Sequence, residues 1–112
     1  MKEERKKKWE SIMQKIASDY IVEELREDSW DFGIITITET KISPDFSYVD
    51  FYVSSLYKSE LLTKFLAEYA QEIENRMCRC MAIRKIPKVR FRYDETGKTS
   101  FEIYQEIKKL PL

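Results

Sequence analysis

The sequence predicts a single α+β domain in which helices cover one face of a mixed three-stranded sheet. Two segments place apolar residues at intervals of three and four, which is typical of amphipathic helices. Three shorter segments are rich in β-branched and aromatic residues and alternate apolar with polar positions, as half-buried strands do. The expected order from these patterns is helix, strand, strand, long helix, strand and a short terminal helix.

Composition favours a soluble globular protein of one domain. The chain has 112 residues, of which 43% are hydrophobic and 36% charged, and its formal net charge is zero. A chain of this length can bury one core without disulfides or metals. No apolar run approaches the roughly 20 residues of a membrane span, and no signal peptide is evident. We therefore expect a cytoplasmic monomer with no membrane contact.

The first expected helix covers about residues 5–26 and follows a basic start. Residues 1–8 carry five basic side chains and two glutamates, which predicts a flexible basic arm; it either contacts phosphate or is a solvated helix start. The apolar stripe of this helix is Trp9, Ile12, Met13, Ile16, Tyr20, Ile21 and Leu25. The second half is acidic, so the charges oppose the helix dipole at both ends and tertiary packing must stabilise the helix.

An antiparallel hairpin is expected next. Gly33 opens the β-branched run 34–42, and a Ser43-Pro44-Asp45 turn leads to a second strand over 46–54. Alternation puts Val49, Phe51 and Val53 on one face of this strand and Tyr48, Asp50 and Tyr52 on the other.

A second helical segment and a third strand complete the domain. Apolar residues recur at three and four in the helical segment, with Ser59 as a candidate N-cap: Leu62, Phe65, Leu66, Tyr69, Ile73, Met77 and Met81. Pro87 precedes a strand in which Val89, Phe91 and Tyr93 face inward. A right-handed crossover through the helix makes the second and third strands parallel. A turn at 94–97 and a terminal helix over 101–110 are expected to follow.

The residue types exclude several classes of catalytic site. There is no histidine, so imidazole catalysis, Ser-His triads and histidine metal ligation are impossible. Two glycines cannot build a glycine-rich phosphate loop. Cys78 and Cys80 lie two apart on a helix, where their side chains diverge; we expect one small buried thiol and one partly exposed neighbour. No enzyme activity, cofactor or metal is expected.

The stretch 76–92 is the candidate functional site because it holds seven basic residues and no acidic one. They are Arg76, Arg79, Arg84, Lys85, Lys88, Arg90 and Arg92. Such a cluster in a neutral chain indicates a polyanion partner, and Lys6, Lys7 and Lys8 of the arm join it as candidate RNA contacts. Alternatively, these cations balance the acidic side of the first helix. Tyr48 and Tyr52 beside Arg90 and Arg92 offer a possible base-stacking platform or are ordinary strand residues.

Three segments of this chain resemble ribosome-binding factor A. They are the hairpin residues 33–46, the strand 49–54 and the stretch 83–95, Ile-Arg-Lys-Ile-Pro-Lys-Val-Arg-Phe-Arg-Tyr-Asp-Glu. The resemblance implies a type II KH-like fold of order α-β-β-α-α-β, with an Ala-x-Gly helix kink in place of a GXXG loop. The matching residues here are Tyr69-Ala70-Gln71. Relatives tend to carry arginines where this chain has Glu74, Cys80 and Ala82, and an Asp-Pro-Arg is replaced around Ser29-Trp30-Asp31.

The resemblance further implies a non-enzymatic factor that binds the immature 30S subunit and its 16S ribosomal RNA. It would assist late maturation and rRNA processing, with a role in cold adaptation. We expect an arm over 1–8, a KH-like RNA-binding domain over 9–97 and a terminal helix or tail over 98–112. The alternative is a protein-interaction module that docks on a ribosomal or assembly protein, with incidental RNA contact.

Overall fold

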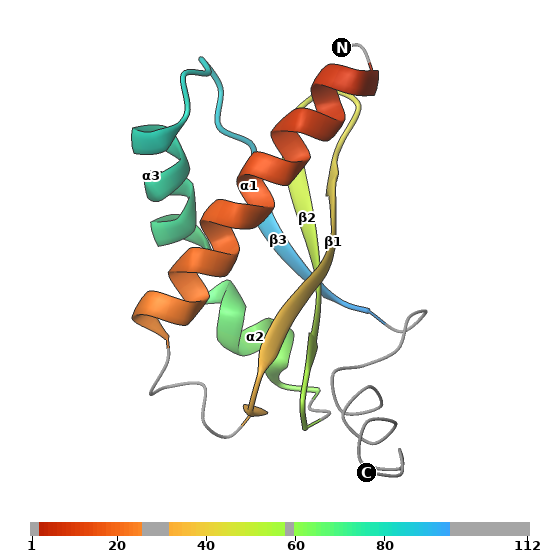
Figure 1. Ribbon diagram of the computed structural model, residues 1–112, viewed down its shortest axis with the longest axis vertical. Helices are drawn as coiled ribbons and strands as arrows, with labels where there is room; N and C mark the ends of the chain where they lie inside the picture. Colours follow the sequence, from red (N-terminus) through yellow and green to blue (C-terminus); the bar gives the residue numbers. More distant parts are fainter. Residues whose placement is uncertain (1–2, 26–31, 58–59, 95–112) are drawn as a thin grey trace, which may run out of the picture.

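The computed structural model describes residues 3–25, 32–57 and 60–94, which form one layer of helices on one sheet (Figure 1). The elements follow the order helix, two strands, two helices and a strand. Their bounds are α1 Glu3–Glu24, β1 Ile35–Ile42, β2 Tyr48–Ser55, α2 Leu62–Ala67, α3 Ala70–Cys80 and β3 Lys88–Tyr93. No helix among these residues is long and apolar enough to cross a bilayer. The predicted N-cap Ser59, the turn at 94–97 beyond Asp94 and the terminal helix lie outside the described residues.

The sheet has the predicted topology. Its order is β1-β2-β3, with β1 antiparallel to β2 and β2 parallel to β3. The register of β1 shifts between Ile37 and Glu39, so that Thr38 is an extra residue. This bulge brings Ile37, Thr40 and Ile42 to the covered face, which simple alternation would not do.

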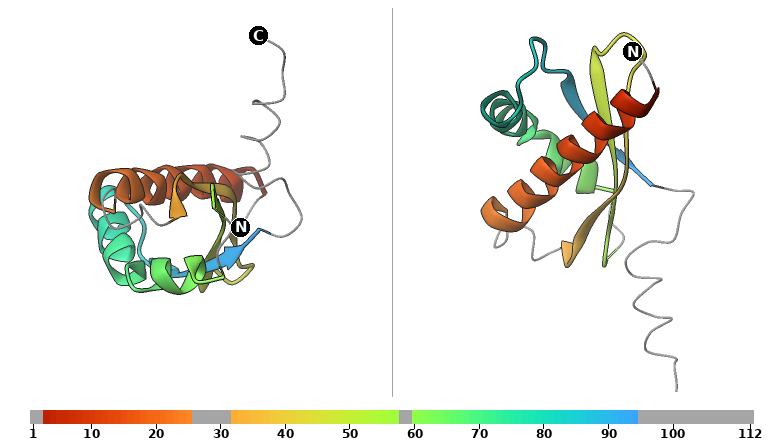
Figure 2. Two further views of the ribbon diagram at one scale, coloured as in Figure 1. Left: turned by 90° about the horizontal axis from the view of Figure 1, so that it is seen from below. Right: turned by 45° about the horizontal axis from the view of Figure 1, so that its top comes forward.

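One hydrophobic core lies between the helices and the covered face of the sheet. Val49, Phe51 and Val53 of β2 have no exposed surface, as predicted. The helices contribute the other large side chains without exposed surface: Met13, Leu62, Leu66, Ile73 and Met77. In Figure 2, α1 lies over β1 while α2 and α3 lie toward β3. Burial of this kind is the main term that offsets the entropy of ordering the chain.

The first helix begins earlier than predicted. It starts at Glu3 and ends at Glu24, whereas we expected 5–26. Residues 3–8 are therefore helical, which corresponds to the alternative of a solvated helix start. The reason is that lysine, arginine and glutamate are good helix formers, and the buried stripe that begins near Trp9 holds the helix they extend.

The single long helix expected from the apolar spacing is wrong: the segment is two helices, as the family resemblance implies, with a break at Glu68 and Tyr69. The amide nitrogens of both residues donate to carbonyls three positions back, at 3.3 and 3.0 Å, and α3 then starts with Ile73 N donating to Tyr69 O at 3.1 Å. This tighter turn redirects the chain without glycine or proline. The reorientation lets α2 pack on β2 and β3 while α3 packs on β3 and α1.

The prediction of one buried thiol is also wrong, since Cys78 and Cys80 are both exposed and free. The buried face of α3 is formed by Ile73 and Met77. Cys80 ends the helix, and Met81, in extended conformation and 7% exposed, fills the next core position instead.

Candidate nucleic-acid interface

The seven cations of residues 76–92 lie on three different parts of the fold. Arg76 and Arg79 are on α3, Arg84 and Lys85 are on the loop of residues 81–87 between α3 and β3, and the other three are on β3. They do not form a single surface. Three of them are held in ion pairs, and four make no ion pair with another described residue: Arg79, Arg84, Lys85 and Lys88.

The α3–β3 loop presents two cations on an apolar base. Pro87 is fully buried, and Ile83 and Ile86 pack against the core. Arg84 and Lys85, between these apolar residues, are exposed. Because the neighbours on both sides are held in the core, the position of the exposed tip is set by packing and not by the cations themselves.

The β1–β2 turn lies against the end of this loop, where Lys88 N donates to Ser47 O at 2.9 Å. Ser43 Oγ organises the turn: it donates to Asp45 Oδ1 at 2.8 Å and accepts from the amides of Ser47 and Tyr48, both at 3.0 Å. Hydrogen bonds from Ser47 and Ser43 lower the pKa of Asp45 to about 2. Phe46 has a φ of 63°, so the turn holds a non-glycine residue in the left-handed region.

The start of α1 lies at the same end of the molecule as the β1–β2 turn and the α3–β3 loop (Figures 1 and 2). Lys7 and Lys8 are exposed there and Lys6 is half-buried. We call this surface the basic end and define it by Arg5, Lys6, Lys7, Lys8, Arg84, Lys85 and Lys88. The arm and the loop, predicted as separate sources of charge, thus occupy one end of the domain.

Arg76 does not belong to the basic end, because it joins α3 to the acidic part of α1. Its guanidinium pairs with Glu23 Oε2 at 3.0 Å and Glu24 Oε1 at 3.3 Å, and lies 5.0 Å from the centre of the Tyr20 ring. The interpretation that these cations balance the first helix is therefore correct for Arg76.

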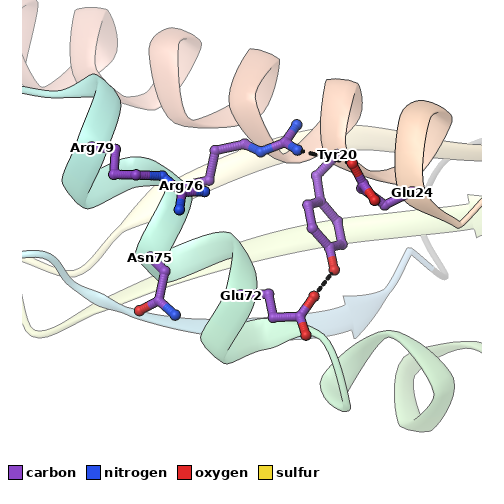
Figure 3. A pocket seen from close by; sticks show the side chains of 6 residues that line it. All are labelled: Tyr20, Glu24, Glu72, Asn75, Arg76 and Arg79. Atoms are coloured by element: carbon purple, nitrogen blue, oxygen red, sulfur yellow. Dashed lines mark hydrogen bonds and ion pairs between the residues drawn. The ribbon is translucent and has the colours of Figure 1, made fainter.

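A polar hollow of about 270 Å³ lies between α1 and α3 beside these pairs (Figure 3). Tyr20 Oη donates a hydrogen bond to Glu72 across it. Burial, followed by this bond to a carboxylate, raises the pKa of Tyr20 above its ordinary value. Arg79, Asn75 and Glu24 line the same hollow, together with Arg76. Its two glutamates offset its two arginines, so the hollow has no net preference for an anion.

Arg90 and Arg92 lie on the open face of the sheet and share one carboxylate. Arg90 Nε and Nη2 donate to the two oxygens of Asp50 at 2.7 and 3.1 Å, and Arg92 Nε lies 3.4 Å from Asp50 Oδ1. The hydrogen bond to Asp50 raises the pKa of Arg90. The Arg90 guanidinium also lies 4.1 Å from the centre of the Tyr48 ring. One ring face that a base would need is thus already occupied.

Asp50 and Glu74 are among the carboxylates whose partners the sequence analysis does not identify. The sequence places Asp50 on the outer face of the sheet, but only the observed parallel register pairs it directly with Arg90. Glu74 Oε2, on α3, accepts from Val89 N at 3.3 Å, and no local sequence pattern indicates this contact. Within the described ranges, no cluster of three histidine, cysteine, aspartate or glutamate residues is placed to hold a metal.

Comparison with known proteins gives a consistent match. The family model described as ribosome-binding factor A matches residues 5–107. A ribosome-binding factor A of Rhizobium leguminosarum bv. trifolii is 33% identical over 90 residues, covering 78% of this chain and 64% of the relative. One from Acinetobacter baumannii is 27% identical over 120 residues, covering 95% and 86%.

Solved structures share the fold and confirm the predicted KH-like α+β class. A Thermotoga maritima protein described as a ribosome binding factor A homologue has a TM-score of 0.69 at 26% identity and covers 86% of this chain and 92% of its own. The Thermus thermophilus ribosome-binding factor A has a TM-score of 0.68 at 17% identity, covering 79% and 94%. A model of the Thermus factor fitted into a cryo-EM map of a 30S complex has a TM-score of 0.67 at 16% identity, covering 80% and 96%.

Proposed function

The chain belongs to the ribosome-binding factor A family, and from this premise we propose that it binds the 30S ribosomal subunit through the basic end. There it contacts 16S ribosomal RNA and assists late maturation and rRNA processing without catalysing a reaction itself. A Thermus relative of the same fold is placed in a complex with 30S, which supports this partner.

One observation carries the choice of surface: the exposed cations Arg84, Lys85 and Lys88 make no ion pair with another described residue and lie at the same end as the start of α1. Unpaired, exposed cations can release counterions from RNA without first breaking an internal pair. Arg76, Arg90 and Arg92 would have to give up carboxylate partners to do so. Among the predicted contacts, the proposal therefore rests on the loop and on the three lysines of α1.

The mechanism follows from the type of contact. Lysine and arginine on phosphate fix the position of a protein on RNA but do not read sequence. The fold supplies a rigid arrangement of these cations, so recognition depends on the shape of folded RNA. Binding to an immature conformation of the subunit stabilises that conformation in proportion to the difference in affinity.

The test is the triple variant Arg84→Ala, Lys85→Ala, Lys88→Ala. Each lost phosphate contact should reduce the slope of log K against log salt by about 0.7 to 0.9, measured by co-sedimentation with immature subunits from low to high salt. A control variant replaces Lys15 and Lys64 with alanine, which removes positive charge from exposed sites on the middle of α1 and on α2, away from the basic end. Equal slopes for the triple variant and the unmodified protein would contradict the proposal.

The open face of the sheet favours a second candidate function, docking on a ribosomal or assembly protein. The Asp50, Arg90 and Arg92 cluster is partly neutralised internally and carries an aromatic ring, which suits a protein partner better than a polyanion. A gel shift with free RNA and co-sedimentation with whole subunits separate the two functions. Binding that survives high salt and depends on a protein component of the subunit would favour protein docking.

A further inference from the structure

Glu74 joins the two elements that flank the α3–β3 loop. Its Oε2 accepts the hydrogen bond of the Val89 amide at 3.3 Å, and the side chain is half-buried between α3 and β3. The two residues are 15 positions apart in the chain. The bond therefore closes the base of the segment that carries Arg84, Lys85 and Lys88.

Other contacts hold this segment to the core and to the neighbouring turn: Ile83 and Ile86 pack against the core, and Pro87 is fully buried. Met81 is buried at the end of α3, and Lys88 N donates to Ser47 O of the neighbouring turn. The flank of α3 opposite β3 is fixed to α1 by Arg76 and by the Tyr20–Glu72 hydrogen bond. The hydrogen bond of Glu74 differs from these contacts because it links α3 directly to β3.

We propose that Glu74 is a positioning residue for RNA binding, which holds β3 against α3 so that Arg84, Lys85 and Lys88 keep the spacing that the RNA requires. The inference rests on the proposed function of the basic end. A fixed arrangement of cations loses less conformational entropy on binding than a loose one, so the tie increases affinity although Glu74 touches no phosphate.

The sign of the effect separates positioning from simple electrostatics. Glu74 is a negative charge beside a surface that binds a polyanion, so by Coulomb interaction alone its removal should strengthen binding. A positioning role predicts the opposite whenever the hydrogen bond is lost. Charge and hydrogen bond can be removed one at a time at this position.

Two variants do this. Glu74→Asp keeps the charge but shortens the side chain by one methylene, about 1.5 Å, which takes the carboxylate out of hydrogen-bond range of Val89 N. Glu74→Gln keeps the length and an accepting oxygen but removes the charge. Both are small changes in a half-buried site, and melting curves establish that each variant is folded at the temperature of the binding assay.

We expect Glu74→Asp to bind immature subunits about two- to tenfold more weakly, and Glu74→Gln to bind at least as tightly as the unmodified protein. The Val89 amide, observed by NMR, should exchange faster with solvent in Glu74→Asp but not in Glu74→Gln. Unchanged affinity of Glu74→Asp would overturn the positioning role, whether or not Val89 exchange accelerates. If Glu74→Gln also binds more tightly while Glu74→Asp is unchanged, the charge of Glu74 affects binding through electrostatics alone.

The triple variant of the loop cations identifies which proposal has failed. If it weakens binding while Glu74→Asp does not, the basic end binds RNA and only the positioning role of Glu74 is wrong. If the triple variant binds as the unmodified protein does, the proposed function itself is wrong and the positioning role falls with it.

Discussion

Replacing Arg76 with alanine should separate the stabilising cations of this protein from those proposed to bind the 30S subunit. The side chain is 22% exposed and pairs with two carboxylates, each more than half exposed. Pairs of this exposure contribute about 0.5 kcal/mol each, and a partly desolvated guanidinium over an aromatic ring contributes about 1 kcal/mol. The expected loss in the free energy of unfolding is about 2 kcal/mol, which lowers Tm by about 8 °C for a domain of this size.

The measurement is thermal or urea unfolding of Arg76→Ala, Arg79→Ala and Arg84→Ala, followed by subunit co-sedimentation well below the melting temperature. Arg79 is the matched control, because it is on the same helix and exposed but makes no ion pair with a described residue; its loss should change stability by less than about 0.5 kcal/mol. Arg84→Ala should keep its stability and lose affinity. An Arg76→Ala protein as stable as Arg79→Ala, or one that loses affinity as Arg84→Ala does, would refute the assignment.

Two further changes test the segments on either side of β1. Gly33→Ala should lower the free energy of unfolding in urea by about 2 kcal/mol or more, because the φ of Gly33 is +73° and an added Cβ would lie 2.8 Å from Leu56 Cβ. Ile34→Ala, at the exposed neighbouring position, is the control; equal losses of free energy in the two variants would contradict this reasoning. Asp45→Asn should make the free energy of unfolding depend less on pH between pH 4 and 2. The pKa of Asp45 in the folded protein, about 2, lies below the ordinary 3.8. The stabilisation by the ionised carboxylate is therefore complete above about pH 4 and is lost as pH falls toward 2. Identical pH profiles of the two proteins between pH 4 and 2 would show that the turn does not stabilise the ionised carboxyl.

The sheet was predictable because period-two alternation is a local signal. Val49, Phe51 and Val53 set the covered face of β2, and the crossover rule then made β3 parallel. Those two facts also place Asp50, Arg90 and Arg92 on the same open face, but they do not fix the register that puts Asp50 directly beside Arg90. The sequence therefore predicts the two sheet arginines as RNA contacts, whereas the structure pairs both with Asp50.

The helix break had no such signal in the periodicity. Leu62, Leu66, Ile73 and Met77 keep three- and four-residue spacing when Tyr69 is included, and all four are fully buried. The chain changes direction at Tyr69 while its apolar residues still face the same core, so the pattern reads as one helix. The resemblance to the family placed a kink here, and the structure has it even though Gln71 stands where the family has glycine.

The distribution of charge along α1 is compatible with the proposed binding of RNA at one end of a neutral chain. Lys8 and Glu23 are 15 residues apart, which is about 22 Å along a helix, and the Debye length at physiological salt is about 8 Å. The acidic end of α1 is thus screened from phosphates at the basic end. It is also partly neutralised by Arg76, whose pairs use the glutamates that would otherwise repel RNA. Net charge therefore says little about the partner of this protein, since the cations that matter are those that the fold leaves unpaired.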